Sequence, residues 1–205
     1  MNRIYALIPQ DNDSYAFRDV GHATRTPRPH DFLLPRRDGT DFPLVRRCTC
    51  CGDILDKWNT PLAGFKVANR NLDCGHTYDG VYVVSQRFQD ACLQGKLSGL
   101  VFTALPDDHD FYALSASRVV RIDSQRRKVR FSKQCPQCKQ YSEVTGSTPF
   151  FLSQGENIGG LECVRTDLEY ACHDEKGFFL LCGEDAAAFL RGQQLKGLVV
   201  KEQPQ

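Results

Sequence analysis

Short apolar runs alternate with polar, turn-forming segments along most of the chain. The runs IYALIP (4–9) and SYAFRDV (14–20) predict short strands near the N-terminus. Four prolines then punctuate a polar stretch, which predicts a loop: Pro27, Pro29, Pro35 and Pro43. This loop leads directly into RRCTCCGD (46–53), where three cysteines fall within four positions.

A strand, a helix and a second strand are predicted next. VYVVS (81–85) has the pattern of a buried strand, and Ser85 is a favourable N-cap for the helix that follows it. Three residues then fall on one helical face: Phe88, Cys92 and Leu93. The apolar run LVFTAL (100–105) completes this unit as its second strand.

The C-terminal part repeats this order of elements. FFLLCG (178–183) precedes a helical segment, EDAAAFLRGQQ (184–194), which is followed by the apolar run LVV (198–200). Residues 93–102 align with residues 190–200 if one residue is inserted. The pattern therefore predicts two similar units packed on a shared sheet.

Three further strands are predicted between the units, at FYALS (111–115), RVVRI (118–122) and KVRFS (128–132). The polar segment IDSQRRK (122–128) reads as the turn of a hairpin between the last two. We therefore predict an α+β fold, a mixed sheet with two similar strand-helix-strand units and an inserted zinc-ribbon-like element. This element is formed from about 46–53 and 133–141, within a single domain that spans 1–205.

Composition narrows the functional classes. The 205 residues are 41% hydrophobic, which suits one compact domain, and 26 basic against 25 acidic residues leave a formal charge of +1. The net charge of the protein therefore creates no electrostatic field that would favour a membrane or nucleic acid as partner. Without a signal-peptide core or a membrane-length apolar run, the chain is expected to be cytoplasmic, where cysteines stay available as thiols or metal ligands.

Two close cysteine pairs carry the strongest chemical signal. Cys-x-x-Cys turns point both sulfurs at one spot, and two such turns supply the four thiolates that a tetrahedral zinc accepts. Gly52 sits where a turn commonly needs a left-handed residue after its second ligand, which makes Cys51 that ligand and leaves Cys50 spare. The predicted ligands of one structural zinc ion are Cys48, Cys51, Cys135 and Cys138.

A competing ligand set remains open at this point. Cys74 and His76, in the segment DCGH, offer a thiolate and an imidazole that could complete a local site with the first pair and leave the second pair idle. Lys139 stands where the second turn would be expected to carry a glycine. Four further cysteines lie among apolar neighbours and are expected to be ordinary small apolar residues: Cys92, Cys163, Cys172 and Cys182.

Neither catalysis nor nucleic-acid binding is favoured. The chain contains no GxSxG, HExxH, phosphate-loop or dinucleotide motif, so we do not expect an enzyme. A basic hairpin at 118–133 makes a nucleic-acid-binding zinc ribbon the alternative function. The near-zero overall charge instead favours a solvated hairpin whose charges protect a strand edge.

The paired turns CTCCG and CPQC carry a family resemblance, together with the segment VYVVSQRFQDACLQGKLSGLVFTALP and the ending from VRTDLEYACHDEKGFF to LKGLVV. In order and spacing, from about residue 45 to 200, the chain resembles the double-CXXCG motif family of bacterial proteins. That family is associated with polymorphic toxin systems as immunity proteins. The resemblance implies a chain that binds and neutralises a cognate toxin, and it carries the zinc assignment to the same four cysteines.

Two charged surfaces are candidates for the contact with such a toxin. The acidic loop with Asp107, Asp108 and Asp110 would suit a basic toxin, and the basic hairpin would suit an acidic one. Complementary charge patches raise association rates, which an inhibitor made beside its own toxin needs.

Overall fold

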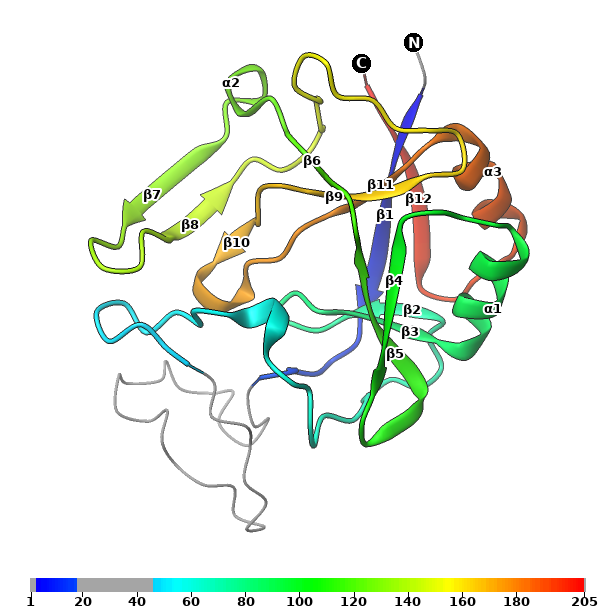
Figure 1. Cartoon of the computed structure of the whole chain (residues 1–205), viewed down its shortest axis with the longest axis horizontal. Coiled ribbons are helices and arrows are strands. Elements are labelled where there is room, and N and C mark those ends of the chain that lie inside the picture. Colours follow the sequence, from blue (N-terminus) through cyan, green and yellow to red (C-terminus); the bar gives the residue numbers. More distant parts are fainter. Residues whose placement is uncertain (1–2, 18–45, 205) are drawn as a thin grey trace.

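A computed structural model describes residues 3–17 and 46–204, and it has a mixed α/β architecture (Figure 1). A nine-stranded mixed sheet contains β1 (Ile4–Asp11), β2 (Cys74–His76), β3 (Tyr82–Ser85), β4 (Leu100–Leu105), β5 (Asp108–Ala116), β6 (Val119–Val120), β9 (Cys163–Thr166), β11 (Leu180–Cys182) and β12 (Leu198–Gln203). A small antiparallel sheet contains β7 (Arg130–Gln134), β8 (Tyr141–Thr145) and β10 (Ala171–Cys172). The α-helices are α1 (Gln86–Gln94), α2 (Ser124–Arg127) and α3 (Glu184–Gly192).

The two halves of the large sheet have the same arrangement. Helix α1 connects β3 to β4, and β5 lies antiparallel between these two strands. Helix α3 connects β11 to β12, and β1 lies antiparallel between them. The helices begin at Gln86 and Glu184 and the strands after them at Leu100 and Leu198, so both pairs have the same spacing in sequence. The units therefore align without the one-residue insertion that the sequence comparison introduced.

The halves are joined by reciprocal backbone contacts. Cys163 N–H donates to the Ser98 carbonyl at 2.8 Å, and Cys74 N–H donates to the Lys196 carbonyl at 3.1 Å. The residue after each acceptor is a glycine with left-handed backbone, Gly99 at φ +85° and its counterpart in the second half at φ +82°. A Cβ atom on Gly99 would lie 2.2 Å from the Cys163 carbonyl oxygen, so the close approach requires glycine.

The same order of elements also surrounds the two cysteine turns. Strand β1 precedes the first turn and pairs in parallel with β2, the strand that follows it. Strand β6 precedes the second turn and pairs in parallel with β9, which follows that turn. Each cysteine turn thus lies in the chain between two strands that pair in parallel.

Strands that are apolar on both faces place the sheet between separate cores. On β11, Leu180 and Cys182 enter one core while Leu181 enters another. The first core also receives Phe88 of α1 and Leu190 of α3, and the two helices lie beside each other over this face (Figure 1). Burial on both faces explains why these strands read as continuous apolar runs instead of alternating ones.

Several local expectations are confirmed and others are wrong. The Ser85 hydroxyl accepts from Phe88 N–H at 3.3 Å, as an N-cap should, but Leu93 is 65% exposed and Ala91 takes its place on the buried face. Residues 14–17 form no strand, and both the rest of that run and the proline-rich loop lie outside the described residues. The expected hairpin between 118–122 and 128–132 is absent, because β6 pairs with β9 and β7 pairs with β8.

Candidate metal centre

The first cysteine turn closes a short hairpin. Gly52 N–H donates to the Cys48 carbonyl at 2.8 Å, and Cys48 N–H donates to the Asp53 carbonyl at 2.9 Å. An antiparallel bridge between Arg47 and Ile54 lies just outside this turn. Gly52 has φ +81°, the left-handed conformation that its place after Cys51 predicts.

The second turn has the same two backbone hydrogen bonds as the first. Lys139 N–H donates to the Cys135 carbonyl at 3.0 Å, and Cys135 N–H donates to the Gln140 carbonyl at 2.8 Å. It lies between β7 and β8, whose last pair is Gln134 with Tyr141. Lys139 adopts φ +63°, so it takes the same left-handed conformation as glycine does in the first turn.

The two turns bring four sulfur atoms together. All four Sγ atoms of Cys48, Cys51, Cys135 and Cys138 lie within 4.8 Å of one another. Across the turns, the Cys48 and Cys135 sulfurs are 3.7 Å apart and the Cys51 and Cys138 sulfurs are 3.6 Å apart. A tetrahedral site with Zn–S bonds of about 2.3 Å has sulfur–sulfur edges of about 3.8 Å. The cluster could therefore hold a metal such as zinc.

Backbone N–H groups stabilise thiolates in this cluster. The N–H of Cys138, followed by that of Gln137, lowers the pKa of the Cys135 thiol to about 6. The N–H of Cys51 likewise lowers the pKa of Cys48, whereas burial raises the pKa of Cys138. Because the thiolate is the metal-binding form, these N–H groups favour in Cys135 and Cys48 the state that a cation requires.

Cys50 lies outside the cluster, as the register set by Gly52 predicts. Its side chain is exposed, and it is not among the four grouped thiols. We expect Cys50→Ser to keep its full metal content and its melting temperature, because no cluster sulfur is removed. Metal analysis and thermal unfolding check this. Loss of metal from Cys50→Ser, with retention in Cys48→Ser, would contradict the register.

Lys139 should be the strained residue of the second turn. A non-glycine residue in the left-handed region costs about 1–2 kcal/mol, offset here in part by the bond of its Nζ to the Pro136 carbonyl at 2.7 Å. We expect Lys139→Gly to raise the melting temperature by about 2–4 °C. Differential scanning calorimetry of metal-loaded protein measures this, and a lower melting temperature would contradict the expectation.

The structure does not bring the competing ligand pair to the first turn. Cys74 is 1% exposed in the core beneath the helices, where burial raises the pKa of its thiol. His76 lies at the end of β2, with Nδ1 3.2 Å from the Asp11 carboxylate. Within the described part of the chain, the four grouped cysteines are the set whose ligand atoms converge.

A buried polar network under the cluster is not predicted by the sequence. The Lys176 ammonium lies 3.1 Å from the Asp53 carboxylate and also donates to the Tyr141 carbonyl, so it connects the residues that follow the two turns. The opposite oxygen of Asp53 lies 2.9 Å from His173 Nδ1. Both charged side chains of the Asp53–Lys176 pair are at least nine-tenths buried. A weak signal exists in the charged run HDEK between apolar segments.

A second buried carboxylate anchors the first turn. Asp174 accepts from Ile54 N–H at 3.0 Å and pairs with the guanidinium of Arg47. The Arg47 guanidinium also donates to the Gly52 carbonyl at 2.9 Å. The ammonium of Lys57 donates to the Asp174 carbonyl at 3.0 Å, and burial lowers the pKa of this lysine to about 8. The first turn is thus fixed to residues 173–176 by side chains that are largely removed from solvent.

The two charged surfaces expected from the sequence are partly neutralised within the chain. Asp108 is 5% exposed and pairs with Arg70, which also contacts Asp110 at 2.8 Å. In the basic segment, Arg118 pairs with Glu162 at 2.8 Å and Arg121 with Glu156 at 2.9 Å. The acidic loop is therefore largely a structural ion-pair cluster, and the basic segment retains only part of its charge for a partner.

Neither a scan against protein-family models nor a search of curated proteins gives a match. None of the helices in residues 3–17 and 46–204 has the length and apolar character that a membrane crossing requires.

Proposed function

We propose that the chain is an immunity protein that binds and neutralises a cognate bacterial toxin, on a scaffold closed by one structural zinc ion. The observation that carries the proposal is the convergence of the two cysteine turns on which the double-CXXCG resemblance rests. Cys48 and Cys51 would hold the ion from the first half of the chain, and Cys135 and Cys138 from the second.

The role of zinc in this proposal is structural. Four thiolate ligands close the coordination shell, so the ion joins two segments and leaves no open position for a substrate. The Asp53–Lys176 pair fixes the same two segments from below. A scaffold held in this way binds a partner with less ordering at the interface, which favours high affinity. We place the protein in the cytoplasm, where reducing conditions keep the thiols available for metal.

Neutralisation by binding and not by turnover predicts a defined stoichiometry. Purified protein titrated against the toxin encoded beside its gene should abolish toxin activity near one molar equivalent, with an affinity of about nanomolar or tighter for an interface of standard size. Coexpression should restore growth. Protection at far below one equivalent would contradict the proposal, because it would require an enzyme that modifies the toxin or repairs its damage.

Cys135→Ser and Cys50→Ser form a matched pair for this titration. Both replace one cysteine of a turn by serine, but only Cys135 belongs to the sulfur cluster. We expect Cys50→Ser to protect as well as the wild type and Cys135→Ser to lose protection, because without the metal the two turns are no longer held together. Equal protection by both variants would show that neutralisation of the toxin does not require the metal.

Nucleic-acid binding through 118–133 is the second candidate function. It is favoured by one observation: one pocket is lined by Arg127, Lys128 and Arg130, and no carboxylate of the described residues lies within 4.0 Å of them. Copurification of RNA or DNA that survives a wash at high salt would favour this candidate over toxin binding, since phosphate contacts alone weaken steeply with salt.

A further inference from the structure

Three basic residues, Arg127, Lys128 and Arg130, form a local cluster of positive charge. Several other arginines have a carboxylate within 4.0 Å: Arg47, Arg70, Arg87, Arg118 and Arg121. Among the residues that the structure describes, none places a carboxylate that close to Arg127, Lys128 or Arg130. Three adjacent cations without counter-ions repel one another, and a bound anion would relieve that repulsion.

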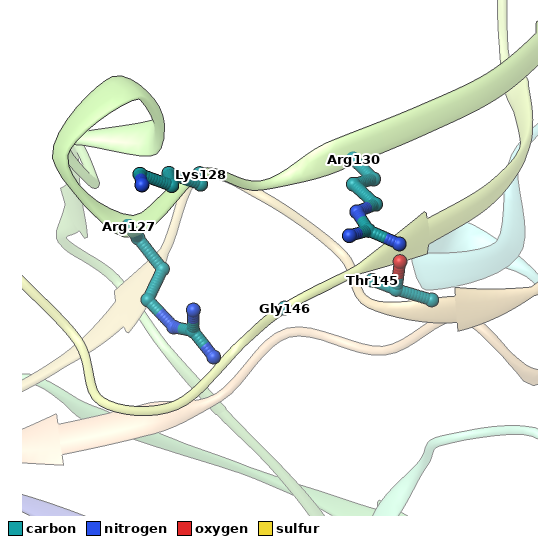
Figure 2. Close-up of a pocket in the computed structure, with 5 residues that line it drawn as sticks. All are labelled: Arg127, Lys128, Arg130, Thr145 and Gly146. Atoms are coloured by element: carbon teal, nitrogen blue, oxygen red, sulfur yellow. The ribbon is translucent and has the colours of Figure 1, made fainter.

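These three residues line a cavity of about 380 Å³ with Thr145 and Gly146. Figure 2 shows the guanidinium groups of Arg127 and Arg130 on opposite sides of the opening, with the Thr145 hydroxyl next to Arg130. The Lys128 side chain extends away from Arg130. Arg127 and Lys128 lie at the end of α2, while Arg130 and Thr145 are paired across β7 and β8, so two elements set the spacing of the charges.

Two buried polar atoms beside this cavity lack partners. Within the described residues, the Nε of Arg127 and the hydroxyl of Tyr170 are the buried side-chain nitrogen and oxygen atoms without a hydrogen bond. Tyr170 is 6% exposed and lines a neighbouring cavity that shares Thr145 and Gly146 with the first. Burial raises the pKa of the Tyr170 hydroxyl, and the positive charge of Arg127 opposes that rise. Unsatisfied buried donors are expensive, and each calls for an explanation such as a bound water or ion.

We propose that Arg127 and Arg130, assisted by the Thr145 hydroxyl and by the nearby positive charge of Lys128, bind a phosphate-type oxyanion. Guanidinium groups on opposite sides of the opening suit a ligand that presents oxygens in several directions, as a tetrahedral phosphate does. A carboxylate presents two oxygens in one plane, and therefore in fewer directions than a phosphate does. This site is independent of toxin binding, and it would stand if that proposal failed.

Isothermal titration of the full-length, metal-loaded protein with inorganic phosphate tests the proposal. We expect measurable binding that weakens by about tenfold in Arg127→Gln and in Arg130→Gln, because each removes a charge-assisted contact. Lys133→Gln is the matched control, since it removes the same charge from the same strand outside the cavity. Arg130 is exposed, so its variant is expected to fold normally, and thermal unfolding verifies this. Equal weakening in all three variants would overturn the site.

Titrations with further ligands identify which kind of phosphate-bearing molecule the site binds. A nucleoside monophosphate and a short RNA are titrated beside inorganic phosphate at two salt concentrations. Binding of all three that depends on Arg127 and Arg130 supports the site, and tighter binding of RNA identifies nucleic acid as the source. Binding of a glutamate-rich peptide without binding of phosphate would overturn the proposal in favour of an acidic protein partner.

Discussion

Cys135→Ser should lose its zinc and unfold about 10 °C below the wild type. A zinc ion bound by Cys48 and Cys135 would close a loop whose ends are 87 residues apart. Closing a loop of this size restricts the unfolded chain by about 4 kcal/mol in the chain-entropy model, and losing the metal removes that restriction. Zinc content per chain and calorimetric unfolding measure the two effects.

Cys172→Ser serves as the control for this variant. Cys172 is an exposed cysteine outside the cluster, and it lies on β10 of the same small sheet. Its replacement should leave both zinc content and melting temperature unchanged. Undiminished zinc in folded Cys135→Ser would remove the second turn from the metal site.

Asp53→Ala should destabilise the protein by about 3–5 kcal/mol, because it leaves the Lys176 ammonium buried without its counter-charge. That ammonium is 3.1 Å from the Asp53 carboxylate, and the two side chains are 8% and 3% exposed. Urea unfolding of metal-loaded protein measures the change, with zinc analysis to show that the cluster is intact.

The double variant Asp53→Ala with Lys176→Met isolates the charge effect. Removing both charges avoids the unpaired ammonium, so the double variant should be more stable than Asp53→Ala alone. Additive losses from the two single changes would show that the pair contributes nothing beyond packing.

The local elements were predictable because their signals are local. The run LVFTAL matches β4 over Leu100–Leu105, and Ser85 starts α1 as its hydroxyl chemistry requires. Pairing between distant strands carries no such signal. Nothing near 118–122 indicates that β6 pairs in parallel with β9 and not with β7, and the amphipathic pattern alone could not decide that Leu93 would remain exposed.

The two cysteine turns were predictable from spacing, because two-residue gaps and Gly52 indicate the geometry of a turn directly. Spacing did not decide whether the second turn or the pair Cys74 and His76 would complete the site with the first turn. The left-handed backbone of Lys139 could not be predicted from its residue type, since it follows from the turn. The Asp53–Lys176 pair depends on burial by segments far apart in sequence, and a charged residue reads as exposed until the fold encloses it.

The duplicated arrangement explains why two turns share one site. Strand β1 begins the first half of the chain and pairs with β11 and β12 of the second half. Strand β5 begins the second half and pairs with β3 and β4 of the first half. The first strand of each half is therefore part of the other half's sheet. The cysteine turns follow β1 and β6, and they converge at one end of the small sheet. One metal bound there would join both halves of the chain.

X-ray absorption at the zinc edge of the purified protein tests this central claim most directly. Four sulfur ligands at about 2.3 Å, with one zinc per chain, are the predicted result. A first shell that contains nitrogen, or a folded protein without zinc, would contradict a metal centre built from Cys48, Cys51, Cys135 and Cys138.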